Sequence, residues 1–314
     1  KRAFSEVKMG KTSKGGRSEL AKYMVEQRPI YVEELHGMVM DHLSGECHIP
    51  ELNISDMIGI PKSKGACLKT SDRRYLYMVE LLKKIIDKIQ LDRIAKAIQK
   101  FAPQSLQGFI ADRSSDMLVY TLVRMAQQRK EAGLATYVAL ADVQKAFPSI
   151  DRLVMYECLE KFGVPEKLVS WIILAHQNTL VRVKQNGIQM EMNTYRGGSM
   201  GSTLMPALYN ITMIVFHATF KKLYPQFAKM KLHVKKGSPF IVTNRVHKMH
   251  DEQQHTIDAH QLIFADDVVG ALESTEMTQQ YYQLTDELQS KWGNMQHADG
   301  SSKKTAGLAI MHKR

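Results

Sequence analysis

The sequence predicts an α+β fold in which amphipathic helices alternate with short strands. The clearest strand pair is the stretch 261–270, where apolar and β-branched residues lie on both sides of Asp266 and Asp267. This pattern is typical of a β-hairpin with carboxylates at its tip. A second apolar strand, 136–142, ends in Asp142, and long helical patterns lie between the strands. Together these observations predict an antiparallel sheet that carries the acids, with helices packed against it.

Composition indicates a large globular chain with a basic surface. The 314 residues include 43 Lys and Arg against 32 Asp and Glu, which gives a formal net charge of +11. Such a balance favours polyanionic partners, either nucleic acid or an anionic membrane surface. No run of about 18 apolar residues occurs, so a spanning helix is not expected and we predict no membrane partner.

The cysteines predict a reducing, intracellular compartment. Cys47, Cys67 and Cys158 lie far apart and form no CxxC pair, so neither a disulfide framework nor a cysteine zinc site is expected. The sequence starts at Lys1 without a signal-peptide pattern, so it is expected to be an excerpt of a longer chain. Nucleus, cytoplasm and organelle are all compatible with this pattern.

The chain begins with a predicted basic arm and short helices. Residues 1–17 are rich in Lys, Gly and Ser, as in an arm that is either solvated or ordered by nucleic acid. Helical spacing over 17–27 and 31–43 is interrupted by Pro29, which predicts two helices.

A strand, a lysine-bearing turn and two long helices are predicted next. The apolar strand 58–60 leads into a turn with Lys62 and Lys64, which either faces solvent or presents ammonium groups to phosphates. The stretch 78–98 has one apolar face and predicts a core helix. A second long helix is predicted over 114–130, with its first serine as the N-cap.

Asp142 is predicted to lie at a rim of the sheet, because it ends a buried strand and precedes a turn. The simpler role of a helix-start signal is already filled by Asp151, which precedes a helix over 152–162. Downstream patterns predict a helix over 165–177, a hairpin of 181–183 with 187–192, a helix over 275–292 and a strand over 307–311.

A Gly-rich stretch, 196–206, opens into an apolar helix over 207–219, so a nucleotide or template strand could approach the backbone closely there. Residues 221–258 form a lysine-rich insertion, predicted to be part hairpin, 231–234 with 240–242, and part loop. Its lysines are expected to contact a nucleic-acid backbone or a partner. The weaker alternative is a zinc site, whose ligands would be His247, His250, His255 and His260.

The adjacent acids Asp266 and Asp267 predict a metal site. Each carboxylate disfavours ionisation of the other unless a cation shares the site, although a polar turn is the alternative interpretation of the dipeptide alone. Hard oxygen ligands suit Mg²⁺ or Mn²⁺. A nucleotidyl-transfer site needs a further acid to hold two ions about 4 Å apart, and Asp142 is the candidate.

Taken in chain order, these stretches resemble reverse transcriptases, most closely the non-LTR retrotransposon and group II intron branch. The similarity runs from about Ile49 to Leu308. In the first half, Ile58–Gly65 is similar to the IPKKG turn of the family, Arg74 with the helix after it to YRPIS…K, and Gln107–Ser114 to Q-GF…GRS. In the second half, Asp142–Phe147 is similar to D-x-x-x-A-F, Gly197–Asn210 to QGS-LSP-L-N, Phe264–Asp267 to F-A-D-D, and Trp292–Lys304 to W-G…K.

The resemblance implies a right-hand polymerase fold. Residues 1–134 would be the fingers, including the basic arm 1–17, and residues 135–314 would be the palm, including the basic insertion 221–258. The family's thumb is not expected within this chain. A thumb, an endonuclease or a maturase region would then belong to further domains of the same polypeptide.

The resemblance also implies the activity of an RNA-directed DNA polymerase, which extends a primer 3′-hydroxyl with dNTPs by a two-metal mechanism. The implied partners are an RNA template, a DNA or RNA primer and a ribonucleoprotein. The implied catalytic residues are Asp142, Asp266 and Asp267, which with the backbone carbonyl of Val143 would bind two Mg²⁺ ions, or Mn²⁺ instead. The implied nucleotide-binding residues are Lys62, Arg74, Val143, Phe147, Met200, Gly201, Lys303 and Lys304.

Phe147 is the residue that the resemblance assigns to sugar selection, because its ring would clash with a 2′-hydroxyl. Met200 stands where the family usually has Gln, and Pro148 stands where Asp is common.

Two alternative functions follow. Met200 and the lack of a thumb favour a nucleic-acid-binding protein derived from a reverse transcriptase without catalysis. An RNA-dependent RNA polymerase would share the palm but usually carries a small or polar residue where Phe147 lies.

Overall fold

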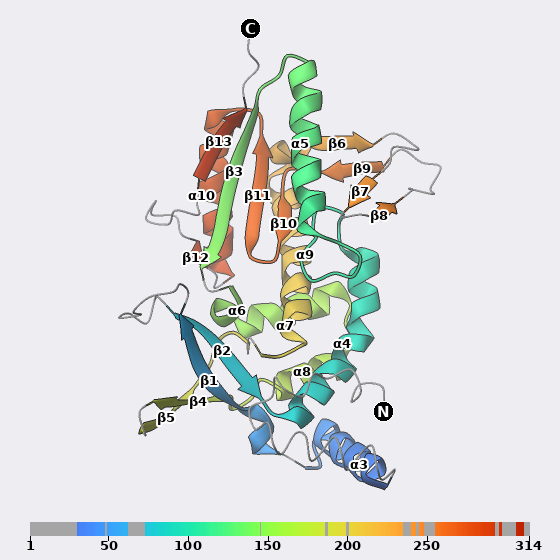
Figure 1. Cartoon of the computed structure of the whole chain (residues 1–314), viewed down its shortest axis with the longest axis vertical. Helices are drawn as coiled ribbons and strands as arrows, with labels where there is room; N and C mark the ends of the chain where they lie inside the picture. Colours follow the sequence, from blue (N-terminus) through green and yellow to red (C-terminus); the bar gives the residue numbers. More distant parts are fainter. Residues whose placement is uncertain are drawn as a thin grey trace. The chain divides into compact units, whose positions relative to one another are not determined.

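The computed structural model describes residues 30–47, 49–61, 73–144, 146–185, 188–198, 201–234, 240–242, 245–247, 255–292, 295–296 and 306–310. Helices and strands are mixed within these residues, which confirms the α+β class. The chain divides into two compact units, each made of two separate stretches of sequence (Figure 1). The first unit takes its residues from 1–96 and 155–208, and the second from 97–154 and 209–314. The division into fingers and palm at residue 134 stays a prediction.

The first unit contains a sheet in the order β2-β1-β4-β5. Strand β1 (Ile54–Pro61) pairs antiparallel with β2 (Arg73–Val79) and parallel with β4 (Leu180–Gln185), which forms a hairpin with β5 (Ile188–Asn193). The amide of Asn53 donates to the carbonyl of Gln177 at 2.7 Å and so ties the start of β1 to a turn that follows a helix. The predicted hairpin of 181–183 with 187–192 is confirmed, except at residue 187, which lies outside the described residues.

Helices α3 (Ile30–Ser44), α4 (Leu81–Phe101), α7 (Arg152–Phe162) and α8 (Glu166–Leu174) lie mainly in the first unit. The prediction of a helix starting at residue 78 is wrong at its beginning. Residues 73–79 form β2, because alternating aromatic and aliphatic residues there pair along the whole of β1. Helix α4 therefore starts only at Leu81.

The second unit contains the sheet that carries the acids. Its strands lie in the order β10-β11-β3-β12, and β13 also pairs with β3. All of these pairings are antiparallel, and β3 (Thr136–Gln144) is central (Figure 1). The other strands are β10 (Leu262–Phe264), β11 (Asp267–Leu272), β12 (Met295–Gln296) and β13 (Ala306–Ile310). The predicted strand, hairpin and C-terminal strand are confirmed.

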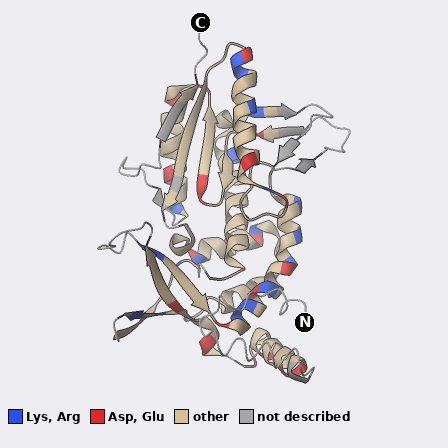
Figure 2. Ribbon diagram, in the orientation of Figure 1, with Lys and Arg blue, Asp and Glu red and all other residues tan. Residues whose placement is uncertain are grey.

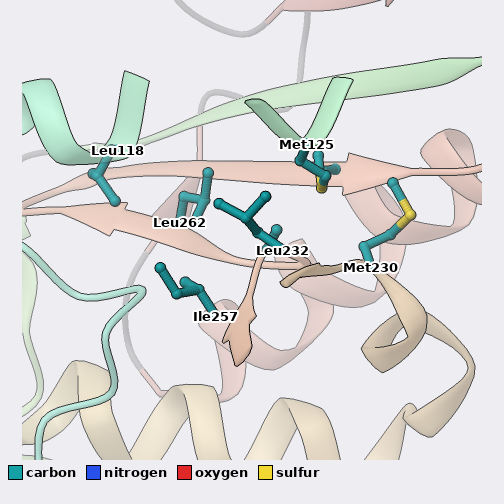
Figure 3. Close-up of a cluster of buried hydrophobic side chains, with 8 residues drawn as sticks. Leu118, Met125, Met230, Leu232, Ile257 and Leu262 are labelled. Carbon is teal, nitrogen blue, oxygen red and sulfur yellow. The ribbon is translucent and has the colours of Figure 1, made fainter. Parts of the chain in front are cut away.

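Helices cover both faces of this sheet. A Cβ atom on Gly270 would lie 2.7 Å from the Tyr281 ring, so α10 (Thr275–Lys291) packs tightly on that face. The next residue, Ala271, joins an apolar cluster with Leu118 and Met125 of α5 (Ser115–Glu131) (Figure 3). Because successive strand residues point to opposite faces, α5 and α10 lie on opposite sides of the sheet. The long helix α9 (Met205–Leu223) packs beside α10 through the rings of Phe220 and Tyr281, 5.4 Å apart.

The basic insertion is partly anchored in the core. Strand β6 (Lys231–Val234) pairs with β9 (His255–Asp258), and Leu232 and Ile257 join the apolar cluster of the second unit (Figure 3). Strand β7 (Phe240–Val242) pairs with β8 (Arg245–His247). The two predicted strands exist, but the prediction that they pair with each other is wrong. Each instead pairs with a strand later in the chain. The local sequence of such short strands does not determine their partner, so long-range packing determines it.

Among the described helices, none is both long and apolar enough to cross a membrane.

Candidate active site

The acids lie at a tight turn between β10 and β11. Phe264 pairs with Asp267, so the turn has Ala265 and Asp266 as its central residues. Ala265 adopts φ 56°, as two-residue hairpins require at their first central position. Asp266 is half-buried and Asp267 is exposed. The predicted hairpin with carboxylates at its tip is confirmed, and Figure 2 shows the acidic tip where β11 begins.

Strand β3 brings Asp142 to this tip. The register places Asp142 directly opposite Asp267, and the backbone N–H of Val143 donates to the carbonyl of Asp266 at 3.4 Å. Residues paired in this way share one face of an antiparallel sheet. The backbone of the predicted metal ligands, Asp142, Val143, Asp266 and Asp267, therefore converges at one end of β3 and the hairpin. The side chain of Asp142 lies outside what the structure describes.

The donor set at this tip fits a divalent cation. Like charges at directly opposed positions repel, and a shared cation removes that repulsion. Carboxylates and a backbone carbonyl are the hard oxygen donors that Mg²⁺ and Mn²⁺ prefer. Among the described side chains, which do not include that of Asp142, no group of three or more His, Cys, Asp or Glu is placed to bind a metal.

Phe147 lies close to the acid strand in a short helix, α6 (Ala146–Ser149), which the sequence pattern did not predict. Its half-buried ring contacts Tyr209 at 5.3 Å between centroids and Phe109 at 5.9 Å. Asp151 accepts from the backbone N–H of Leu153 at 2.9 Å, which confirms it as the start signal of α7.

The loop 104–109 braces the acidic turn. The N–H of Gln107 donates to the carbonyl of Ile263 at 2.9 Å, and the N–H of Ile263 donates to the carbonyl of Ser105 at 2.8 Å. The loop thus extends the outer edge of β10, next to the turn. A Cβ on Gly108 would collide with the backbone nitrogen of Ala265 and lie 3.1 Å from its Cα. Only glycine fits at that distance.

Two side chains hold this loop in place. The buried amide of Asn210 on α9 donates to the carbonyl of Gly108 at 2.9 Å. The guanidinium of Arg113 donates to the carbonyls of Pro103 and Leu106, both at 2.6 Å, and burial lowers its pKa. Sequence reasoning placed Gly108, Asn210 and Arg113 in family motifs but gave them no role. Of the three, Asn210 alone carries a local signal, because it is a polar residue between Tyr209 and Ile211.

The described parts of the Gly-rich stretch, 196–198 and 201–206, make contacts within the first unit. Ser202 donates to the buried carboxylate of Asp87 at 2.6 Å, and Lys83 donates to the same carboxylate at 2.7 Å. The Ser202 hydroxyl also accepts from the N–H of Leu204 at 3.1 Å and so caps the start of α9. Gly198 packs against Met205 with no space for a Cβ. Within the described part of this stretch, 196–198 and 201–206, the Ser202 side chain is therefore anchored to α4.

The predicted nucleotide-binding residues are distributed over the chain. Arg74 is exposed on β2 and Gly201 lies in the turn before Ser202, both in the first unit. Val143 and Phe147 lie in the second unit. Lys62, Met200, Lys303 and Lys304 lie outside the described residues. Of this set, Val143 contacts the acidic turn directly through its hydrogen bond to Asp266, and Phe147 contacts Phe109 of the loop that braces the turn.

A buried histidine pair lies beneath the sheet. His217 of α9 and His260 stack with ring centroids 4.8 Å apart, and a ring nitrogen of His217 lies 3.1 Å from Gln261 Oε1. Burial, then the neighbouring His217, lowers the pKa of His260 to about 3. Burial also lowers the pKa of His217. His260, one of the predicted zinc candidates, is therefore a packed core residue. The His250 candidate lies outside the described residues.

This pair predicts acid sensitivity. In the unfolded chain, His260 becomes protonated below its ordinary pKa of 6.5. In the folded protein, the same ring stays neutral down to about pH 3. His260 should therefore leave the free energy of unfolding unchanged above pH 6.5. Below pH 6.5 it should lower that free energy by up to ~1.4 kcal/mol per pH unit. Urea midpoints between pH 7.5 and 5 should show a steeper slope in wild type than in His260→Phe. The exposed His36→Gln serves as control, and equal slopes in wild type and His260→Phe would contradict the assignment.

A pair of adjacent acids on a hairpin, opposite a third acid on the neighbouring antiparallel strand, is the palm arrangement of right-hand nucleic-acid polymerases. The chain belongs to the reverse transcriptase (RNA-dependent DNA polymerase) family, which matches residues 60–234. That match covers more than half of the 314 residues and includes Asp142, Phe147 and the Gly-rich stretch. The family prediction is confirmed.

Solved telomerases share the fold. The apo telomerase of Candida tropicalis, truncated from its C-terminal domain, matches with a TM-score of 0.55 at 12% identity, over 84% of this chain and 51% of that one. The telomerase of Candida albicans, in complex with a fragment of telomeric RNA, matches with a TM-score of 0.53 at 10% identity, over 83% and 42%. The chain thus spans about half the length of these structures. At such identities the likeness shows the right-hand polymerase fold alone.

Proposed function

We propose that this chain is the catalytic core of an RNA-directed DNA polymerase, which extends a primer 3′-hydroxyl with dNTPs on an RNA template. The observation that carries the proposal is the register of β3 against β11, which sets Asp142 opposite Asp267 beside the Asp266 turn. Three acids at one sheet end serve no packing purpose, but they suit phosphoryl transfer, where they would hold the divalent ions that neutralise developing negative charge. The family match supports the same reaction class.

Asp142, Asp266 and the carbonyl of Val143 would hold two divalent ions, with Asp267 as a further ligand. When bound, these ions supply charge neutralisation at the triphosphate and lower the pKa of the primer 3′-hydroxyl. The protein's own part is positional. The hydrogen bond from the Val143 N–H to the Asp266 carbonyl holds β3 and the turn at a fixed spacing. The brace formed by the loop 104–109 keeps the turn from moving away.

The remaining roles in the proposal come from the family motifs. Lys62 and Arg74 would meet the triphosphate, and Lys303 or Lys304 would protonate the leaving pyrophosphate. Met200 and Gly201 would line the nucleotide. Residues 1–134 would act as fingers and 135–314 as the palm, with the lysine-rich insertion 221–258 on the nucleic-acid backbone.

Primer extension on an RNA template tests the proposal. The purified chain should extend a DNA primer with dNTPs in Mg²⁺, fail to do so in EDTA, and prefer dNTPs to rNTPs. Template binding without extension in Mg²⁺ or in Mn²⁺ would instead indicate a non-catalytic nucleic-acid-binding protein. Efficient extension with rNTPs would indicate an RNA-dependent RNA polymerase.

The sugar preference should depend on Phe147. Its ring is half-buried between aromatic neighbours, so it is held firmly enough to exclude a 2′-hydroxyl by steric overlap. Phe147→Ala should raise the ratio of rNTP to dNTP incorporation by roughly tenfold or more, since relief of such a clash is worth more than ~1.4 kcal/mol. Single-nucleotide incorporation kinetics measure this ratio. An unchanged ratio would show that a residue other than Phe147 excludes the 2′-hydroxyl.

A further inference from the structure

Phe109 is an exposed aromatic residue at the end of a segment that is otherwise fixed. The residue before it, Gly108, is held by Asn210 through its carbonyl and packs against the backbone of Ala265. Gln107 is bonded to Ile263 of β10. Yet the Phe109 side chain is 56% exposed. An exposed phenylalanine adds little to a core, so packing of the second unit alone gives no reason for a large ring here.

The backbone of Phe109 has a conformation that is unfavourable for a phenylalanine. Its φ is 56°, in the left-handed region that bulky residues rarely adopt. Such a conformation persists only where the surroundings impose it, and it is found most often at functional sites. Here the surroundings are the hydrogen bonds of Gln107 and Gly108. The loop therefore holds Phe109 in an unfavourable conformation.

That conformation places the Phe109 ring against Phe147. The two ring centroids lie 5.9 Å apart at an interplanar angle of 45°. Phe147 also meets the ring of Tyr209 edge-on at 5.3 Å, and Tyr209 is fully buried. Phe147 is thus in contact with one immobile ring from α9 and one exposed ring from the braced loop. Aromatic pairs at these distances restrain each other's orientation.

We propose that Phe109 is a positioning residue for sugar selection, because its ring holds Phe147 in the orientation that meets the sugar of the incoming nucleotide. The inference rests on the proposed polymerase function. It assigns no chemistry to Phe109 itself, which acts only through Phe147. Tyr209 supports Phe147 from the core, and Phe109 supports it from the exposed loop. Without Phe109, the Phe147 ring could move aside and admit a 2′-hydroxyl.

The test measures kcat/KM for one dNTP and its matching rNTP on the same primer and RNA template. Phe109→Ala should raise the rNTP to dNTP ratio by roughly two- to tenfold, the range expected for the loss of one aromatic pair. Phe109→Tyr keeps the ring and should restore the wild-type ratio. Because Phe109 is exposed, neither change should prevent folding. Phe101→Ala is the matched control, since Phe101 is 60% exposed in the same unit and its ring contacts Lys100 instead.

A double variant shows whether Phe109 acts through Phe147. In a Phe147→Ala background, Phe109→Ala should change the ratio no further, because coupled residues are not additive. The inference is wrong if wild type extends with dNTPs and Phe109→Ala leaves the ratio at the wild-type value. It is equally wrong if Phe109→Ala lowers both incorporations alike, or if Phe109→Tyr behaves as Phe109→Ala does. A wild-type chain that extends with neither substrate overturns the proposed function instead.

Discussion

Asp266→Ala is expected to lower primer extension at least a thousandfold while template binding stays unchanged. Asp266 is the half-buried central residue of the turn, and its backbone is bonded to the strand that carries Asp142. Removing its carboxylate would weaken the binding of the divalent ions that neutralise the developing charge, a loss worth about 4 kcal/mol or more, and each ~1.4 kcal/mol is tenfold in rate. Rates should be measured by quenched primer extension, and binding by fluorescence anisotropy of labelled RNA.

Asp116→Ala is the matched control for this variant. Asp116 is an exposed acid in the first turn of α5, in the same unit but on a different element. The Asp116→Ala variant should extend primers at the wild-type rate. Near-normal extension by Asp266→Ala would refute the two-metal polymerase mechanism, and Asp142→Ala should repeat the result from the opposing strand.

Gly108→Ala is expected to have the second largest effect. The added methyl would collide with the backbone of the acidic turn at Ala265, and backbone cannot give way as a flexible side chain can. The loop and the turn must separate, which should cost roughly 3 kcal/mol of stability. A displacement of about 1 Å at the acids should lower extension about a hundredfold. The free energy of unfolding and the extension rate together measure both consequences.

Gly37→Ala provides the contrast. Gly37 lies in α3 and a Cβ there would meet nothing within 4 Å, so alanine should stabilise the helix slightly and leave extension unchanged. The interpretation of the brace fails if Gly108→Ala extends primers as wild type does. A variant that loses stability but keeps its rate at low temperature would show that the turn does not depend on the loop.

The sequence predicted the acidic tip because its signals are local. Apolar runs on both sides of Asp266 and Asp267 define the hairpin, and the apolar run before Asp142 defines β3. Strand pairing of the two then follows from the need to bury both apolar runs. The family motifs named Phe147 as well, although the short helix that carries it was not predicted.

The brace of the turn was not predictable in the same way. Its contacts join Gly108 to Ala265 and Asn210, residues far apart in the chain. A glycine in a loop usually indicates a turn, so its use as a close-approach site is visible only once the fold is known. The pairing of β6 with β9 escaped prediction for the same reason, since short strands carry little register information of their own.

The central place of β3 has a consequence for how the protein is made. Residues 137–140 of β3 pair on one edge with β11 and on the other with β13. Both partners follow β3 in the chain by more than a hundred residues. On the ribosome, β3 therefore emerges with both edges open, and unpaired edges of apolar strands are sites of aggregation. An apolar β3 is therefore prone to aggregate until β11 and β13 have been synthesised and can pair with it.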